Sequence, residues 1–411
     1  MNKSIPDPYA IALDAIDVSN PDLYQTDSWR PWFARLRKED PVHWSENKDF
    51  GGFWSVTRFE DIVTVDKSHD DFSSEPAITI GDYGDDLPVR QFIAMDPPLH
   101  DIQRKAVQGV VAPRNLADLE TLIRSRVATM LDALPVGEPF NWVDRVSVNL
   151  TTQMLASIFD FPFEDRHKLP YWSDMAASLP EIAGGDGDND ERTRALTECL
   201  ETFTALWHQR KYNPPGTMDL ISMLATNPET AAMVDDPMEY LGNLLLLIIG
   251  GNDTTRNSIT GGVVALNQHP EQFAQLKANP DLVSSMVPEI IRWQTPLMHM
   301  RRIATRDVVL GGKTIRKGDK VVMWYLSGNY DETAIDEPNA FNITRDNPRY
   351  HLSFGFGIHR CMGNRLGEMQ LRILWEEILK RFSDVEMIGE PQRIQSNFVR
   401  GYSELPVVLH R

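Results

Sequence analysis

The sequence predicts a mainly α-helical protein with a minor β region, built as one domain over residues 1–411. Three observations favour this fold class. Helical periodicity occupies most segments from Arg114 to His208 and returns in the stretches 236–268 and 364–382. Between Val308 and Met323, V-V-L-G-G-K-T-I-R-K-G-D-K-V-V-M alternates around turn residues and predicts small strands. No internal repeat, low-complexity tract or domain linker interrupts the chain.

The first half of the chain is expected to begin irregularly. Residues 1 to about 50 contain one short helical stretch, and F-W-S-V-T-R-F-E-D-I predicts a strand and then a helix that starts near Thr57. The helices that follow Arg114 are broken at P-V-G-E-P, at F-P-F-E-D and at Ala183–Glu191. The last of these, A-G-G-D-G-D-N-D-E, predicts an acidic loop between helices.

The segment Asp236–Gln268 predicts a helix of about 45 Å, at 1.5 Å per residue. Asp236 is a good N-cap, Pro237 suits the first helical position and Pro270 closes the far end. The middle of the segment reads G-G-N-D-T-T, and each glycine should cost about 1 kcal/mol relative to alanine. Threonine hydroxyls and an opened hydrogen-bond ladder can kink a helix and hold water there. The pattern therefore indicates either a packing kink or a place for chemistry.

The loop Phe354–Gly363, F-G-F-G-I-H-R-C-M-G, sets one cysteine before the predicted helix 364–382. Free N–H groups and the positive end of the helix dipole favour an anion there, which predicts a lowered thiol pKa and a thiolate presented to a metal. Gly355, Gly357 and Gly363 allow sharp turns and close approach to a flat cofactor. An isolated cysteine is otherwise more often a small buried hydrophobe.

Composition limits the setting of the protein. A formal net charge of -18 argues against a nucleic-acid partner. The 2 cysteines, Cys199 and Cys361, cannot form a secreted disulfide framework, so we expect a reducing cytoplasm and an inert thiol at Cys199. The first residues lack an apolar signal core or a membrane anchor, and the apolar run Leu244–Ile249 is far shorter than the roughly 20 residues that span a bilayer.

Basic residues gather in sequence around the cysteine of an otherwise acidic chain. They predict either a dock for an acidic electron donor or ordinary solvated charge. The residues are Arg349, His359, Arg360 and Arg365, to which Arg104, Lys105 and Arg114 can be added.

Several motifs together resemble those of the cytochrome P450 superfamily. The pattern F-x-x-G-x-x-x-C-x-G, with His359 two residues before the cysteine, resembles its haem-ligating loop. Gly250–Thr255 resembles its oxygen-binding helix, and Glu289-Ile-Ile-Arg292 its E-x-x-R motif, with Phe341–Arg345 supplying a third, structural member. M-D-P-P-L-H-D-I-Q-R resembles a further segment of the family. The resemblance covers nearly the whole chain and implies the cytochrome P450 fold around haem b, iron protoporphyrin IX.

The resemblance also implies roles for individual residues. Cys361 would ligate the iron, with Phe354, Gly355 and Gly363 of its loop and Gly250 of the long helix against the haem. Thr254 and Asp253 would form the acid–alcohol pair that delivers protons. The residues expected at the haem propionates are His100, Arg104, Arg302 and His359.

Within the superfamily the chain resembles the soluble bacterial monooxygenases, which take electrons from a separate [2Fe-2S] ferredoxin and its NAD(P)H-dependent reductase. The sequences of three segments resemble those of the bacterial alkane terminal hydroxylases. These enzymes use O2 to convert medium-chain n-alkanes, and often fatty acids, to the primary alcohol. Because a terminal C–H bond is stronger than its methylene neighbour, such an enzyme must enforce position by steric orientation.

Apolar side chains that face the haem in the family are the expected substrate walls, with ordinary core packing as the other interpretation. They are Leu246 and Ile249 on the long helix, Leu297 and Met298 after E-x-x-R, and Phe398 near the C-terminus, with Ile78–Ile80 as a possible roof.

Three alternatives stay open. The same motifs serve terpenoid or steroid hydroxylases, because the haem loop does not fix the shape of the pocket. A peroxide-driven peroxygenase would need no ferredoxin, although peroxygenases of this fold tend to lack the acid–alcohol pair. A non-catalytic haem sensor or a purely structural helical protein would leave the cost of Gly250 and Gly251 unexplained.

Overall fold

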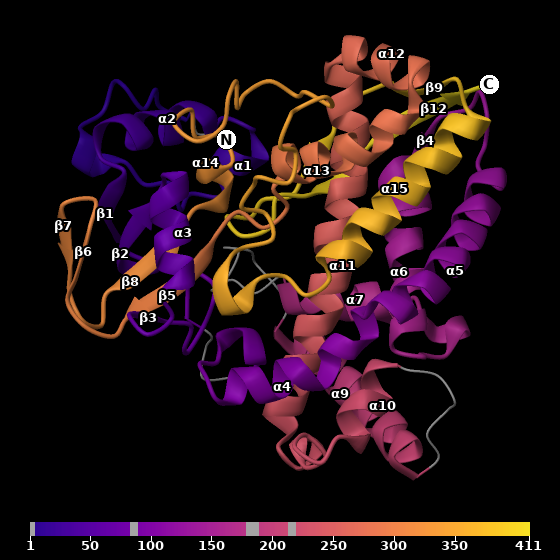
Figure 1. Ribbon diagram of the computed structural model, residues 1–411, viewed down its shortest axis with the longest axis horizontal. Helices are drawn as coiled ribbons and strands as arrows, with labels where there is room; N and C mark the ends of the chain where they lie inside the picture. The colour runs from indigo at the N-terminus through magenta and orange to yellow at the C-terminus, as the bar shows by residue number, and fades with distance from the viewer. Residues whose placement is uncertain (1–4, 83–88, 178–188, 213–218) are drawn as a thin grey trace.

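The computed structural model describes residues 5–82, 89–177, 189–212 and 219–411. A helical region and a smaller strand-rich region lie side by side, and the long helix α11 (Pro237–Gln268) runs through the helical region (Figure 1). This arrangement confirms the prediction of a mainly α-helical protein with a minor β region. The other α-helices are α1 (Asp22–Gln25), α2 (Arg30–Glu39), α3 (Phe59–Lys67), α4 (Leu99–Val107), α5 (Pro113–Asp132), α6 (Asn149–Ile158), α7 (Lys168–Ala177), α9 (Asn189–Tyr212), α10 (Leu220–Thr226), α12 (Pro270–Ala278), α13 (Val283–Gln294), α14 (Tyr325–Gly328) and α15 (Asn364–Arg381).

The largest sheet has the strand order β1-β2-β8-β5-β3, in which β2 and β8 are parallel and the other pairs antiparallel. Its strands are β1 (Val42–Asn47), β2 (Gly51–Val56), β3 (Phe72–Ser73), β5 (Met300–Ala304) and β8 (Lys320–Met323). The remaining strands form the sheet β4-β12-β9 and the pairs β6-β7 and β10-β11. They are β4 (Phe140–Asn141), β6 (Val308–Leu310), β7 (Lys313–Ile315), β9 (Asp384–Met387), β10 (Gln392–Arg393), β11 (Tyr402–Glu404) and β12 (Pro406–His410).

The N-terminal region is more regular than the sequence predicts. Helix α2 buries Trp32, Phe33 and Leu36 on one face, and β1 forms a hairpin with β2. The predicted strand and helix around Thr57 are confirmed as β2 and α3. Residues 183–188 of the predicted acidic loop lie outside the described residues, and its last residues already belong to α9.

Helix α11 begins and ends where the sequence predicts. The carboxylate of its N-cap Asp236 accepts hydrogen bonds from the N–H groups of Met238 and Glu239, each 3.2 Å long. The helix continues through Gly250–Thr255, where the Thr254 hydroxyl donates to the carbonyl of Gly250.

The two glycines in the middle of α11 have different surroundings, and only Gly251 serves close approach between helices. A Cβ atom on Gly251 would lie 2.8 Å from the side chain of Leu155 on α6, so this glycine lets the two helices pack closely. A Cβ atom on Gly250 would meet nothing within 4 Å, because this residue borders open space.

A buried ion-pair network confirms the structural triad predicted from the E-x-x-R motif. On α13 the Arg292 guanidinium lies 2.7 Å from Oε1 of Glu289, and both side chains are fully buried. Arg345 approaches Oε2 of Glu289 at 3.1 Å. Arg292 also donates to the backbone carbonyls of Asn329 and Pro338, so its buried guanidinium is both ion-paired and hydrogen-bonded.

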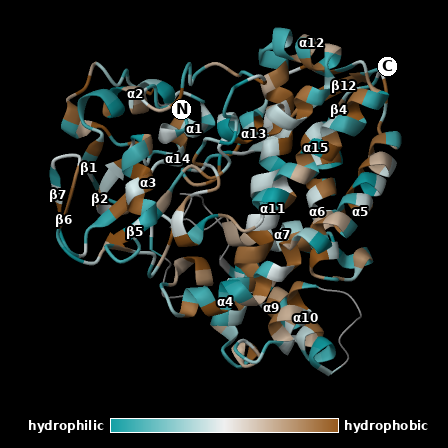
Figure 2. Cartoon of the chain, viewed as in Figure 1, coloured by the Kyte–Doolittle hydropathy of each residue, from teal (hydrophilic) through white to brown (hydrophobic). Residues whose placement is uncertain are grey.

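In the part of the chain that the structure describes, the core forms three apolar clusters. One surrounds the second half of α11 and α15, another joins α7, α9, α10 and the first half of α11, and the third lies against the five-stranded sheet. Figure 2 shows hydrophobic and hydrophilic residues on the same helices, as expected of helices that bury one face. None of the described helices is both long enough and apolar enough to cross a membrane.

Candidate functional site

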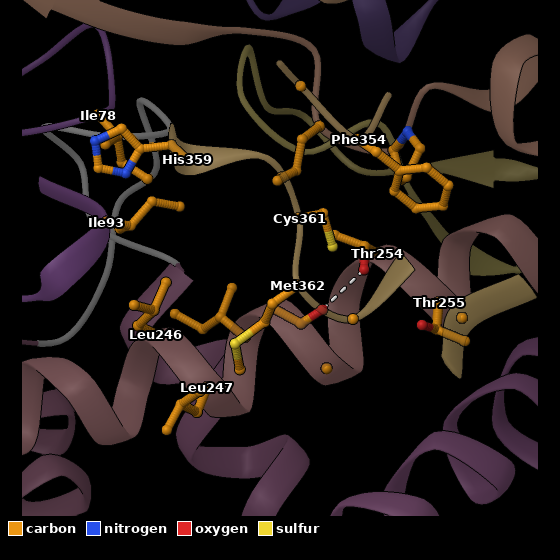
Figure 3. A pocket seen from close by; sticks show the side chains of 18 of the residues that line it. Ile78, Ile93, Leu246, Leu247, Thr254, Thr255, Phe354, His359, Cys361 and Met362 are labelled. Atoms are coloured by element: carbon orange, nitrogen blue, oxygen red, sulfur yellow. Dashed lines mark hydrogen bonds between the residues drawn. The ribbon is translucent and has the colours of Figure 1, made fainter. Parts of the chain in front are cut away.

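A cavity of about 310 Å³ lies between α11 and the cysteine loop. Figure 3 shows Cys361 and Thr254 facing this space from opposite elements. Its lining is polar or charged beside the cysteine and mostly apolar farther away. Four-residue spacing on α11 puts Leu246, Gly250 and Thr254 on the one helix face that borders the cavity.

The cysteine loop is held by its backbone. The N–H of Cys361 donates to the carbonyl of Phe354 over 2.8 Å, which closes the loop. Gly355 and Gly357 both have φ of +64°, where other residues are strained, and a Cβ atom on Gly357 would lie 2.4 Å from the carbonyl oxygen of Asp66. Phe354, Gly355, Cys361 and Gly363 all line the cavity, as the sequence predicts for the loop.

The thiol of Cys361 lies just before α15, which begins at Asn364. The N–H groups of Gly363 and Asn364, with the Arg104 and Arg360 guanidinium groups, favour the thiolate. Burial has the larger effect and raises the thiol pKa above its ordinary value. The groups predicted to lower the pKa are therefore present, but in the free thiol, which is exposed to the cavity, the loss of solvation outweighs them.

Two arginines reach the cysteine end of the cavity. Arg302, on β5, is almost fully buried, and its guanidinium lies 2.8 Å from the Asp66 carboxylate of α3. Arg104, on α4, donates to the carbonyl of Arg360 in the cysteine loop. Both line the cavity, so the positions predicted from sequence converge on one place.

Two histidines stand beside these arginines, with ring centroids 4.3 Å apart. Nε2 of His359 is 2.8 Å from Ser74 Oγ, and Nδ1 of His100 is 2.8 Å from the Asp101 carboxylate. The other ring nitrogen of each histidine is buried and has no hydrogen-bond partner among the described residues. Burial lowers the pKa of both histidines, that of His359 to about 2, so the free site holds neutral rings.

Thr254 and Asp253 are neighbours that point in different directions. The Thr254 hydroxyl lines the cavity and donates to the carbonyl of Gly250 over 2.9 Å, a bond drawn in Figure 3. The Asp253 side chain is 1% exposed and turns away, toward Ser173 of α7 and its own helix neighbour Arg256. Among the described residues no hydrogen bond joins the side chains of the predicted acid–alcohol pair.

The environment of Asp253 brings the pKa of its carboxyl closer to neutral pH. Burial raises its pKa to about 6, although Arg256 at 3.2 Å opposes the shift. One carboxyl oxygen, Oδ2, has no partner among the described residues. The Arg256 guanidinium also lies 2.9 Å from the Asp174 carboxylate of α7. A movement of α7 would therefore change how strongly Arg256 stabilises the ionised form of Asp253. Sequence analysis missed Arg256 and Asp174 because ordinary surface ion pairs look the same in sequence.

The apolar end of the cavity matches the predicted walls except at one residue. Leu246, Ile249, Leu297 and Phe398 line it. Met298 does not: it is fully buried in the core, because neighbouring side chains in an extended segment point to opposite sides.

Other wall residues carry no sequence signal of their own. Ile93 and Leu247 border the cavity in Figure 3, as does Ile78 from the predicted roof. Met300 and Val399 also line it. In the sequence these apolar residues look like any other core residue, so only the fold could identify them.

Comparisons with known proteins agree with this geometry. The family model described as Cytochrome P450 matches residues 106–404. The chain is 35% identical to linalool 8-monooxygenase of Pseudomonas putida, with 97% of this chain and 99% of that protein covered. It is 32% identical to methyl-branched lipid omega-hydroxylase of Mycobacterium tuberculosis, with 91% and 90% covered. The solved structure of cytochrome P450-153 from Novosphingobium aromaticivorans matches with a TM-score of 0.89 and 42% identity, over 96% and 99% of the two chains.

Proposed function

The chain belongs to the cytochrome P450 family, whose members use haem b, and from that premise we propose that this monooxygenase hydroxylates the terminal carbon of medium-chain n-alkanes or fatty acids. One observation carries the proposal. A single cavity joins a cysteine and a cluster of cationic or hydrogen-bonding groups at one end to a mostly apolar slot at the other. The first end suits haem, and the second suits an unbranched hydrocarbon chain.

The residues present fit a haem. Cys361 would supply the thiolate ligand of the iron, and Gly250 leaves open space on the facing helix. The unpartnered ring nitrogens of His100 and His359, beside two arginines, would hold the propionate carboxylates. Bound haem activates O2 and inserts one oxygen atom into a C–H bond.

We assign proton delivery to Thr254 and Asp253. The Thr254 hydroxyl reaches the cavity, where it can pass a proton to a reacting group on that side. With a pKa of about 6, the Asp253 carboxyl can both bind and release a proton near neutral pH. Because Asp253 faces Arg256 and Ser173, its carboxyl must turn away from α7, or work through water, to reach the cavity.

The apolar walls would exclude water and fix the substrate. Leu246, Leu297 and Phe398 approach from three separate elements, so they can confine a chain on several sides. Only such confinement can favour the stronger terminal C–H bond over the methylene beside it. The name of one relative, an omega-hydroxylase, supports attack at a chain end.

Electrons would come from a [2Fe-2S] ferredoxin supplied by its NAD(P)H-dependent reductase. Lys105, Arg360 and Arg365 are exposed near the cysteine loop, on a chain whose net charge is -18. An acidic ferredoxin would be steered to this basic area and repelled elsewhere, and added salt would slow electron transfer.

A second candidate is hydroxylation of a terpenoid, which is favoured by 35% identity to linalool 8-monooxygenase over nearly the full length of both proteins. An optical titration of the haem-loaded protein tests the choice. Octane, dodecanoic acid, a monoterpene and a steroid are added in turn, and the Soret band reports displacement of axial water. A shift with the linear chains supports our proposal, whereas a shift with the monoterpene or the steroid alone overturns it.

A further inference from the structure

A buried histidine outside every motif connects two walls of the cavity. His299 lies between Met298 and Met300 and is 0% exposed. Its Nε2 accepts a hydrogen bond from the N–H of Ile80, 3.1 Å away. Its Nδ1 lies 3.1 Å from the carbonyl oxygen of Asn397.

These two partners fix the state of the ring. A carbonyl oxygen can only accept, so Nδ1 carries the proton and donates it to Asn397. The backbone N–H of Ile80 can only donate, so Nε2 carries none. Burial lowers the pKa of His299 to about 3, which keeps the imidazole neutral and in this tautomer at physiological pH.

Both connected segments contribute to the cavity. Ile78 and Thr79 line it from one side, next to Ile80. Phe398 and Val399 line it from another side, next to Asn397.

Further contacts make the connection a junction of three segments. The ring of His299 packs edge-on against that of Phe398, with centroids 5.2 Å apart. The backbone on either side of His299 is bonded to the same two segments. The N–H of Met298 donates to the carbonyl of Phe398 over 2.8 Å, and the N–H of Arg301 donates to the carbonyl of Ile78 over 2.7 Å.

We propose that His299 is a positioning residue for regiochemistry: by bonding Ile80 and Asn397 it holds two cavity walls at the spacing that presents a chain end, and not an inner carbon, for oxidation. This inference rests on the proposed terminal hydroxylation and adds the residue that enforces it.

Removal of the imidazole would leave two buried backbone groups without a hydrogen-bond partner that they now have. Without the imidazole, the N–H of Ile80 and the carbonyl of Asn397 are buried with one partner fewer. Each segment then gains by shifting toward water or another partner. Such a shift moves Ile78 and Phe398, so the slot widens and the chain can bend to offer its second carbon.

Three substitutions separate the two bonds. His299→Phe keeps a ring and loses both hydrogen bonds. His299→Asn places an amide donor near the position of Nδ1, so it can keep the hydrogen bond to Asn397 but loses the one from Ile80. His299→Gln places an amide acceptor near the position of Nε2, so it can keep the hydrogen bond from Ile80 but loses the one to Asn397. The haem-loaded variants are supplied with ferredoxin, reductase and octane, and the ratio of terminal to subterminal alcohol is measured. We expect this ratio to fall about fivefold or more in His299→Phe, and by less in each of the other two.

Tyr240→Phe is the matched control, because it removes one buried hydrogen bond, to the carbonyl of Phe203, at a residue that does not line the cavity. It should lower Tm and leave the ratio unchanged. An unchanged ratio in His299→Phe, or in both His299→Asn and His299→Gln if the first variant does not bind haem, overturns the inference. If wild-type protein makes no alcohol from octane, the proposed function fails separately, and the same ratio is read on whichever chain substrate it oxidises.

Discussion

The two ends of the cavity are assembled in different ways. At the cysteine end, Cys361, Arg302 and His359 are held by hydrogen bonds or ion pairs to named partners. At the apolar end, the side chains of Leu246 and Phe398 come from distant parts of the chain and make only apolar contacts, while hydrogen bonds hold the backbone of the Phe398 segment. Turnover and regioselectivity should therefore be separable. Substitutions at the cysteine end should abolish turnover, and substitutions at the apolar end should change which carbon is hydroxylated.

The largest effect is expected from the iron ligand. Cys361→Ser replaces the thiolate that haem would need, so hydroxylation should fall to the limit of detection. The carbon monoxide difference spectrum of the reduced protein measures the loss of thiolate ligation directly. Cys199→Ala is the matched control, because this second cysteine is fully buried in α9 and does not line the cavity. Retained thiolate ligation in Cys361→Ser would contradict the assignment.

Next in size is proton delivery. Thr254→Ala and Asp253→Asn should each lower product formation by about 10- to 100-fold, because a positioned acid or hydroxyl contributes that much or more. Haem content and the substrate-induced Soret shift should stay as in wild type. Thr254→Ser keeps the hydroxyl and should recover most of the activity. Normal turnover in Asp253→Asn would show that the carboxyl takes no part.

Two adjacent residues test the apolar end. Leu297→Ala enlarges the slot and should shift the ratio of terminal to subterminal alcohol by about tenfold, equivalent to about 1.4 kcal/mol. Met298→Ala opens a hole in the core and should cost about 2–5 kcal/mol of stability with an unchanged product ratio. Product analysis and urea denaturation measure the two effects. If the product ratio responds to Met298 and not to Leu297, the assignment of the wall is wrong.

The smallest expected effect is the pH dependence of stability that Asp253 contributes. Its pKa is about 6 in the folded protein and 3.8 in a free carboxyl, so the folded state binds the extra proton. Stability is therefore lost as pH rises through 6. Between pH 5 and 7, wild type should lose about 1 kcal/mol of unfolding free energy more than Asp253→Asn. Parallel urea titrations at the two pH values measure the difference, and parallel pH dependence in both proteins would contradict the raised pKa.

Sequence reasoning predicted the cysteine end well because short motifs fix it locally. Cys361, Gly250 and the pair Glu289 and Arg292 lie where their spacing places them. The desolvation that opposes the predicted lowering of the free thiol's pKa depends on the whole fold and not on the motif.

The apolar end was predicted only in part. Met298 was assigned to the wrong side of its strand-like segment, and Ile93 and His299 were missed altogether. Their positions depend on which distant segments meet, such as the pairing of Leu297 with Val399. No local pattern encodes that meeting.

The most direct test of terminal hydroxylation is the product distribution from octane, measured by gas chromatography with ferredoxin, reductase and NAD(P)H supplied. We predict 1-octanol as the main product, because the walls around Leu297 and Phe398 would hold the chain end toward the cysteine side of the cavity. Predominant 2-octanol and 3-octanol, or no octanol beside efficient oxidation of linalool, would contradict it.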